Sequence, residues 1–266
     1  MDDLRVSLVQ GDTLWHDPEA NHAMYGAMIA DLAGRTDLVV LPETFSSGFS
    51  NEAIHRAQTM DGPSVAWIRE QAAKLGAVVT GSMQVREGEG VYNRLLWATP
   101  QGELHTYDKR HLFRMAKEHE RYAAGGKRRT FELKGWRVCP LVCYDLRFPV
   151  FIRNRFGNEA AGRFDYDLLV FVANWPNARR HAWRTLLRAR AIENLSCVAG
   201  VNRVGTDGYE LRYDGDSVAL DPLGEVLVEC GAQPQVVTAS FSASGLARHR
   251  ERFPAQLDAD SFTLHD

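Results

Sequence analysis

Short apolar runs, separated by turn residues and amphipathic helices, are the feature that most constrains how this chain can fold. Strands are predicted at residues 4–10, 38–41, 77–83, 92–98, 104–107, 138–142, 167–173, 196–202, 218–220, 225–229 and 236–241. Helices are predicted at residues 21–32, 63–75, 150–155, 182–194 and 248–254. Because short β–β turns alternate with longer β–α–β crossovers, the pattern favours an α/β fold of mixed sheets covered by helices on their outer faces. No repeat or linker divides the 266 residues, so we expect one domain.

The composition is that of an ordinary globular protein without a polyanionic partner. Hydrophobic residues make up 45% of the chain and charged residues 24%, which is enough apolar material for a sizeable core. The formal net charge is -3, whereas nucleic-acid-binding proteins usually carry a basic excess, so we expect no nucleic-acid partner. The arginine-rich stretches 127–129 and 179–180 are interpreted as solvated loop charges.

The cysteines and histidines predict neither a disulfide scaffold nor a metal site. Four scattered cysteines match no zinc-binding spacing, and no histidine cluster accompanies them. Cys139 and Cys197 lie in apolar runs and are interpreted as packing residues, whereas Cys230 beside Gly231 is expected to be exposed. No signal peptide, membrane span or glycine-rich nucleotide loop is visible, so we expect a cytoplasmic protein without a membrane partner or a cofactor.

The strand predicted at residues 138–142 ends directly in Cys143, and Pro149 suits the first turn of a helix a few residues later. Cys143 is therefore expected at a sharp strand-to-helix turn, beside free backbone N–H groups that stabilise negative charge. This placement favours Cys143 as a nucleophile. The alternative is a small buried apolar residue, which is what most free cysteines are.

Two further polar residues follow predicted strands closely, Glu43 after residues 38–41 and Lys109 after residues 104–107. If these strands are neighbours, both side chains converge on Cys143. A glutamate can accept the thiol proton, and an ammonium can lower the pKa of the thiol and stabilise an anionic tetrahedral intermediate. The three residue types together indicate acyl transfer through a thioester.

Several blocks of the chain, in order, resemble the nitrilase (carbon–nitrogen hydrolase) superfamily. They are Leu41-Pro42-Glu43, Tyr107-x-Lys109-x-His111-Leu112, Cys143-Tyr144-Asp145-x-Arg147-Phe148-Pro149, Ala173-Asn174-Trp175-Pro176, residues 188–194 and Gly215-Asp216-Ser217. Each block is weak alone, but together they span nearly the whole chain and are specific.

The resemblance implies a fold, an assembly and a set of roles. The fold is a four-layer α-β-β-α sandwich with two mixed sheets, spanning residues 1–266 as a single domain. Members usually pair into dimers, and residues 246–266 are expected to form a C-terminal extension at that interface. Glu43 is implied as the base, Lys109 as the cation, Cys143 as the nucleophile and the backbone N–H of Tyr144 as an oxyanion donor. A second active-site glutamate aligns with Glu118, with Glu120 as the alternative.

The residues after the cysteine suggest the branch of the superfamily. Tyr144 and Asp145 stand where nitrilases proper have Trp and Glu, which resembles the amide-hydrolysing branches and most closely the bacterial omega-amidases. Those enzymes release ammonia from 2-oxoglutaramate or 2-oxosuccinamate without a metal or organic cofactor. The alternatives are a hydrolase of N-carbamoyl amides, a hydrolase of deaminated glutathione, or a non-catalytic binding protein on the same fold.

Four further residues are candidates for the substrate pocket, and each has a structural alternative. Arg147 is a candidate partner for a substrate carboxylate, or else a salt bridge that shapes the turn. Phe148 and Trp175, with Tyr144, can wall a small pocket or belong to the core. Asn174 is interpreted as holding a loop by side-chain to backbone hydrogen bonds near the site.

Overall fold

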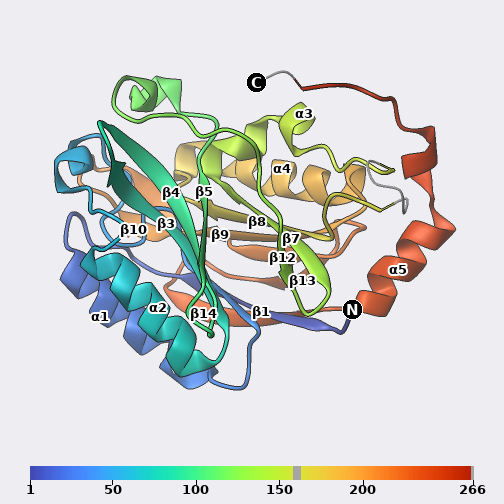
Figure 1. Cartoon of the computed structure of the whole chain (residues 1–266), viewed down its shortest axis with the longest axis horizontal. Helices are drawn as coiled ribbons and strands as arrows, with labels where there is room; N and C mark the ends of the chain where they lie inside the picture. The colour runs from blue at the N-terminus through green and yellow to red at the C-terminus, as the bar shows by residue number, and fades with distance from the viewer. Residues whose placement is uncertain (158–162, 265–266) are drawn as a thin grey trace.

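Two six-stranded mixed sheets form the centre of the protein, and a computed structural model describes residues 1–157 and 163–264 (Figure 1). The parallel strands β1, β2 and β3 lie at the middle of the first sheet and antiparallel pairs flank them. In order across that sheet, the strands are β14 (Gln235–Phe241), β1 (Leu4–Gln10), β2 (Leu38–Val40), β3 (Val78–Glu87), β4 (Gly90–Ala98) and β5 (Leu104–Asp108).

The second sheet has the same plan, with β7, β8 and β9 parallel at its middle. Its strands are, in order, β13 (Val226–Glu229), β12 (Val218–Leu220), β9 (Cys197–Asn202), β8 (Leu168–Ala173), β7 (Trp136–Val142) and β6 (Phe131–Leu133). The sequence pattern missed β6 and a small antiparallel pair, β10 (Val204–Thr206) with β11 (Arg212–Asp214), because strands this short carry too little hydrophobic alternation to detect.

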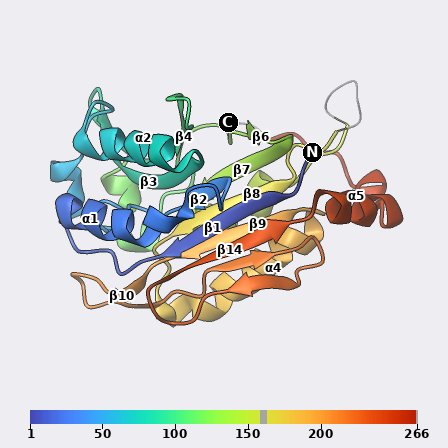
Figure 2. The ribbon, with the colours of Figure 1, turned by 90° about the horizontal axis from the view of Figure 1, so that it is seen from below.

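Helices cover the outer face of each sheet, which completes the predicted four-layer α-β-β-α sandwich (Figures 1 and 2). Helices α1 (Pro18–Ile29) and α2 (Pro63–Leu75) lie on the first sheet, and α4 (Arg180–Glu193) lies on the second. The last helix, α5 (Ala243–Arg252), lies at one edge close to the N-terminus. No helix in the described ranges is both long enough and apolar enough to cross a bilayer.

One predicted helix is shorter than expected, since α3 covers Pro149–Ile152 rather than residues 150–155. The helix ends before Asn154, whose side chain bonds to the backbone of two other segments. Its amide donates to the carbonyls of Tyr166 and Asn194 at 3.0 Å each, and its side-chain carbonyl accepts from the N–H of Tyr166. These bonds hold the chain extended, so the helix cannot continue.

Residues 265 and 266 of the predicted C-terminal extension lie outside the described residues.

The first sheet has a hydrophobic core on each of its two faces, and successive side chains of its strands point alternately into one core and the other. Leu4, Val6 and Leu8 of β1 point between the sheets and pack in one cluster with residues of the second sheet. Val9 of the same strand points outward and packs with Tyr25 of α1. This period of two is what a strand covered on both faces requires.

Truncation of a side chain between the sheets should destabilise the protein. Leu8 is fully buried there, so Leu8→Ala is expected to lower the free energy of unfolding by about 2–5 kcal/mol, because it removes apolar contacts and leaves a cavity. Urea unfolding should show a lower midpoint with an unchanged slope. The matched control is Leu227→Ala on β13, where the leucine is 44% exposed and a change within about 0.5 kcal/mol is expected. Equal losses in both variants would contradict this core.

Candidate active site

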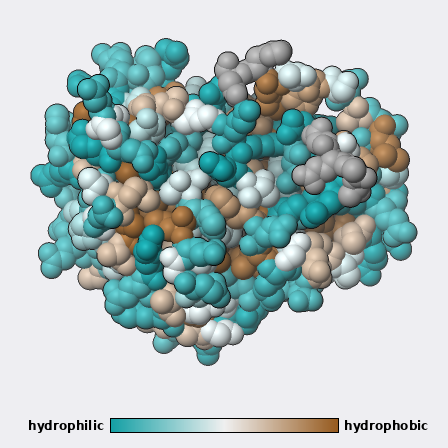
Figure 3. Space-filling view, in the orientation of Figure 1, coloured by the Kyte–Doolittle hydropathy of each residue, from teal (hydrophilic) through white to brown (hydrophobic). Residues whose placement is uncertain are grey.

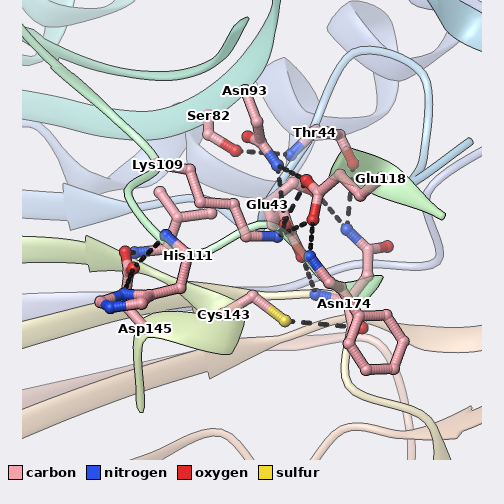
Figure 4. A network of polar contacts seen from close by, with 12 residues as sticks. Glu43, Thr44, Ser82, Asn93, Lys109, His111, Glu118, Cys143, Asp145 and Asn174 are labelled. Atoms are coloured by element: carbon pink, nitrogen blue, oxygen red, sulfur yellow. Dashed lines mark hydrogen bonds and ion pairs between the residues drawn. The ribbon is translucent and has the colours of Figure 1, made fainter. Parts of the chain in front are cut away.

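The structure brings Glu43, Lys109 and Cys143 together from three strand ends, as predicted (Figure 4). Glu43 follows β2, Lys109 directly follows β5 and Cys143 directly follows β7. The first two strands belong to one sheet and the third to the other, so the cluster bridges the two sheets at one end of the sandwich. All three side chains are buried.

Lys109 is the centre of a buried ionic cluster with two carboxylates. Its Nζ lies 2.9 Å from Oε1 of Glu43 and 3.0 Å from both carboxylate oxygens of Glu118. Glu118 is fully buried, whereas Glu120 is exposed at the surface. Of the two glutamates that the sequence left open, the structure therefore places Glu118 in the cluster. The backbone N–H of Phe113 also donates to Glu118, at 2.5 Å, and fixes the second oxygen.

Asn93 of β4 is a member of this cluster that sequence reasoning missed. Its side-chain amide donates to Oε1 of Glu43 at 2.8 Å and to Oε1 of Glu118 at 3.5 Å. Its backbone carbonyl accepts the backbone N–H of Lys109 at 3.0 Å, so one residue contacts both carboxylates and the main chain of the lysine. The available signal was an asparagine, a residue that is rare inside strands, within the strand predicted at residues 92–98.

The charges of the cluster stabilise one another. Burial alone would lower the pKa of Lys109, but the negative charges of Glu118 and Glu43 outweigh it and hold that pKa above its ordinary value. Burial raises the pKa of Glu118, and the charge of Lys109 offsets part of this rise. Lys109 therefore remains an ammonium at neutral pH.

Cys143 occupies a strained turn between β7 and a 3-10 helix, η5 (Cys143–Arg147). Its φ of 43° lies in the left-handed region, which costs a non-glycine residue free energy and is found mainly at functional sites. The first backbone N–H groups of this short helix, including that of Tyr144, have no partner within the helix. They can therefore donate to an oxygen in the site.

The resting form of Cys143 is the thiol, not the thiolate. Burial raises the pKa of Cys143 well above its ordinary value, and the charge of Glu43 raises it further. The charge of Lys109 lowers that pKa, as expected for a nearby cation, but burial and the charge of Glu43 outweigh it. The thiol donates to the carbonyl oxygen of Asn174, with its Sγ 3.8 Å from that oxygen, and Glu43 is the charge that most opposes its ionisation. Ionisation therefore requires proton transfer to a neighbouring base.

Asp145 ties the cysteine turn to the segment that carries Lys109. It is fully buried and accepts hydrogen bonds from the N–H of Val142 at 3.1 Å, the hydroxyl of Tyr107 at 2.8 Å and the N–H of His111 at 3.1 Å. The Nδ1 of His111 lies 2.7 Å from the same carboxylate. Residues 107–111 and the start of η5 are therefore held in one arrangement by a single carboxylate.

Asn174, which follows β8, holds Glu43 in place from the other side. Its backbone N–H donates to Oε2 of Glu43 at 2.8 Å. Its side-chain amide donates to the backbone carbonyl of Glu43 at 2.6 Å and to the hydroxyl of Thr44 at 3.0 Å. The loop-holding interpretation of Asn174 is therefore confirmed.

The cluster opens onto a cavity of about 280 Å³ with a largely aromatic wall. Tyr144, Arg147 and Trp175 line it, as the pocket hypothesis predicted. The guanidinium of Arg147 lies over the ring of Trp175 at 5.0 Å. Phe148 is not among the lining residues; its ring stacks on His111 with centroids 3.7 Å apart.

Two interpretations of surface residues need correction. Arg179 is not a solvated loop charge, because the hydrogen bond from Nε1 of Trp175 to the Arg179 carbonyl, 2.9 Å long, folds the segment back over the cavity, and Arg179 lines it. Its neighbour Arg180 forms an ion pair with Asp216 at 2.5 Å. Cys230 is buried rather than exposed, because its backbone N–H pairs with the carbonyl of Ser217 beside β12.

Within residues 1–157 and 163–264, no group of three metal-ligating side chains is arranged to hold an ion.

Comparison with known proteins identifies the family. The sequence model of the carbon-nitrogen hydrolase family matches residues 5–251. The chain belongs to this family. It is 44% identical over 265 residues to the omega-amidase YafV of Escherichia coli strain K12, covering 99% of this chain and all of that protein. It is 34% identical over 252 residues to the 2-oxoglutaramate amidase of Bacillus subtilis, covering 94% and 95% of the two chains.

A solved structure agrees over the entire chain. The Xanthomonas campestris protein XC1258, described as a CN-hydrolase superfamily protein with an arsenic adduct in the active site, superposes with a TM-score of 0.98 at 65% identity and covers 100% of both chains. The predicted superfamily, its fold and an amide-hydrolysing enzyme are thus confirmed. The alternative of a non-catalytic binding protein is set aside.

Removal of the Glu43 charge should lower the pKa of the Cys143 thiol. In Glu43→Gln we expect the pH profile of iodoacetamide labelling at Cys143 to shift to lower pH, because the nearby negative charge that opposes ionisation is gone. Mass spectrometry of the peptide that contains Cys143 measures the labelling. Glu120→Gln, at an exposed glutamate outside the cluster, is the control and should leave the profile unchanged. An unshifted profile in Glu43→Gln would show that the carboxylate does not act on the thiol.

Proposed function

We propose that this carbon–nitrogen hydrolase cleaves the terminal amide of a small oxo-acid amide, of the 2-oxoglutaramate or 2-oxosuccinamate type, into a carboxylate and ammonia. The observation that carries this proposal is the buried Glu43–Lys109–Glu118 cluster in contact with Cys143 at the wall of a small cavity. The names of the omega-amidase and 2-oxoglutaramate amidase relatives support the substrate class. No metal or organic cofactor takes part in the proposed reaction.

The first half of the proposed reaction forms a thioester. Glu43 takes the proton of the Cys143 thiol, and the sulfur attacks the amide carbon. The carbonyl electrons move to oxygen, where the ammonium of Lys109 and the backbone N–H of Tyr144 stabilise the negative charge. The carbon–nitrogen bond then breaks, and the nitrogen leaves as ammonia with the proton that Glu43 had accepted.

The second half hydrolyses the thioester. Glu43 takes a proton from water, the resulting hydroxide attacks the thioester carbon, and the same oxyanion donors act again. The carbon–sulfur bond breaks, and Glu43 returns its proton to the sulfur of Cys143. Glu118 contacts Lys109 rather than the thiol, and its proposed role is to keep the ammonium charged and in position.

The cavity wall supplies the proposed substrate contacts. Tyr144 and Trp175 present rings that fit a short carbon chain, and Arg147 presents a cation for the carboxylate of the substrate. Asn174 positions Glu43 through its backbone and side-chain bonds. Arg147 has no ion-pair partner in the described part of the chain, which supports a contact with substrate over a salt bridge within the turn.

The assembly and cellular location are also proposed. A homodimer is supported by exposed apolar side chains in the C-terminal region, including Phe253 at 59% and Leu257 at 69% exposure. Figure 3 shows hydrophobic atoms at the right-hand edge, where Figure 1 draws this region. A reducing cytoplasm is supported by four free cysteines. A single domain over residues 1–266 is supported by a hydrophobic core that both sheets share.

Removal of the nucleophile should abolish the reaction. In Cys143→Ala we expect ammonia release from 2-oxoglutaramate to fall by at least about 10³-fold, because no thioester can form. A coupled assay for ammonia measures the rate. Cys230→Ala, at a buried cysteine that does not line the cavity, is the matched control and should retain the activity of the unmodified protein. Wild-type rates in Cys143→Ala would refute the proposed mechanism.

A further inference from the structure

Two arginines on the cavity wall keep their N–H groups free of protein acceptors. Neither Arg147 nor Arg179 has a side-chain hydrogen bond or ion pair within residues 1–157 and 163–264. Buried arginines elsewhere have such partners: Arg190 donates twice to the carbonyl of Leu146, at 3.1 and 2.7 Å, and Arg203 donates to Asp12 at 2.9 Å. The N–H groups of Arg147 and Arg179 are therefore available to a ligand.

Aromatic rings hold both guanidinium groups without using their donors. Arg179 lies over the ring of Phe113 at 5.1 Å, and Arg147 lies over the ring of Trp175 at 5.0 Å. A guanidinium that stacks on a ring keeps its five N–H donors in its own plane, where they can reach a carboxylate in a bidentate manner. Each guanidinium therefore has an aromatic neighbour and still has N–H donors available to an anion.

The two arginines belong to one continuous wall. Trp175 lies under Arg147, and its Nε1 donates to the carbonyl of Arg179 at 2.9 Å. Phe113, which lies under Arg179, meets the ring of Tyr144 edge-on with centroids 5.0 Å apart. The cations therefore lie on the same aromatic surface that borders the Cys143 turn, from two different segments of the chain.

The other charges around the cavity make this pair necessary for an anionic substrate. The ammonium of Lys109 is shared between the carboxylates of Glu43 and Glu118, so the reacting end of the cavity has no cation left for a substrate carboxylate. Asp207 also lines the cavity, but its carboxylate already accepts from the hydroxyl of Tyr213 at 2.7 Å and from two backbone N–H groups. Without a cationic region elsewhere in the cavity, these carboxylates would repel the carboxylate of the substrate.

We infer that Arg179 is a specificity-determining residue, which with Arg147 binds the substrate carboxylate that lies at the end remote from the amide. This inference rests on the proposed function and adds the residue that selects acidic amides over uncharged ones. Charge-assisted bidentate hydrogen bonds to this carboxylate provide affinity for the substrate and fix its orientation, so that the amide carbon lies next to Cys143.

The test compares an anionic amide with an uncharged amide of equal chain length. For 2-oxoglutaramate, Arg179→Gln is expected to raise KM by at least about tenfold with little change in kcat, because a charge-assisted contact that the substrate makes throughout the reaction is lost. For pentanamide, which has no carboxylate, kcat/KM should stay the same or rise. Arg179→Lys keeps the charge but not the planar fork, so its KM for 2-oxoglutaramate should be intermediate.

The control is Arg180→Gln at the neighbouring arginine, whose ion pair with Asp216 lies outside the cavity lining. It should leave the preference for 2-oxoglutaramate unchanged. If the wild-type enzyme prefers 2-oxoglutaramate and Arg179→Gln keeps the same preference, the inference is overturned and the proposed function stands. If the wild-type enzyme prefers pentanamide, the proposed function fails and the inference fails with it.

Discussion

The ammonium of Lys109, buried between two carboxylates, is the interaction on which the site depends. A buried charge is costly unless it is paired and hydrogen-bonded, and here every charge has a partner within 3.0 Å. The three groups come from separate segments, so their mutual attraction only exists when both of the glutamate loops and the end of β5 are in place. Asn93 strengthens this requirement, because its side chain contacts both carboxylates and its backbone carbonyl accepts the backbone N–H of Lys109.

The same cluster explains why the nucleophile needs a base. A thiol beside one cation in water would ionise more readily, but Cys143 is buried and lies next to Glu43, so the neutral form is favoured. Glu43 and Cys143 line the same cavity, so the carboxylate is placed to accept the thiol proton in the proposed reaction. The turn of Cys143 supplies backbone donors, and Asp145 holds that turn against the segment of Lys109. The proposed nucleophile, base and oxyanion donors are therefore positioned before substrate binds.

Two chemically different surfaces border the cavity. The charged cluster lies beside Cys143, where the proposed reaction takes place, and the aromatic wall with Arg147 and Arg179 lies around it. An arginine that packs against a ring is restrained without using its hydrogen-bond donors, so the donors stay available to a ligand. In contrast, Asp207 is satisfied by its own loop and adds no acceptor for the substrate.

The sequence by itself predicted most of the strands and the three polar residues at strand ends, because these depend on local pattern, whereas the four-layer fold was implied by the family resemblance. Apolar runs predicted the bounds of β1 and of α2 to within a residue, and motif spacing selected Glu43, Lys109 and Cys143. Tertiary structure alone decided what depends on long-range contacts. It placed Glu118 rather than Glu120 beside Lys109, brought in Asn93, and turned Arg179 toward the cavity. It also decided the net direction of the Cys143 pKa shift, since burial and neighbouring charge depend on residues that lie far apart in the chain.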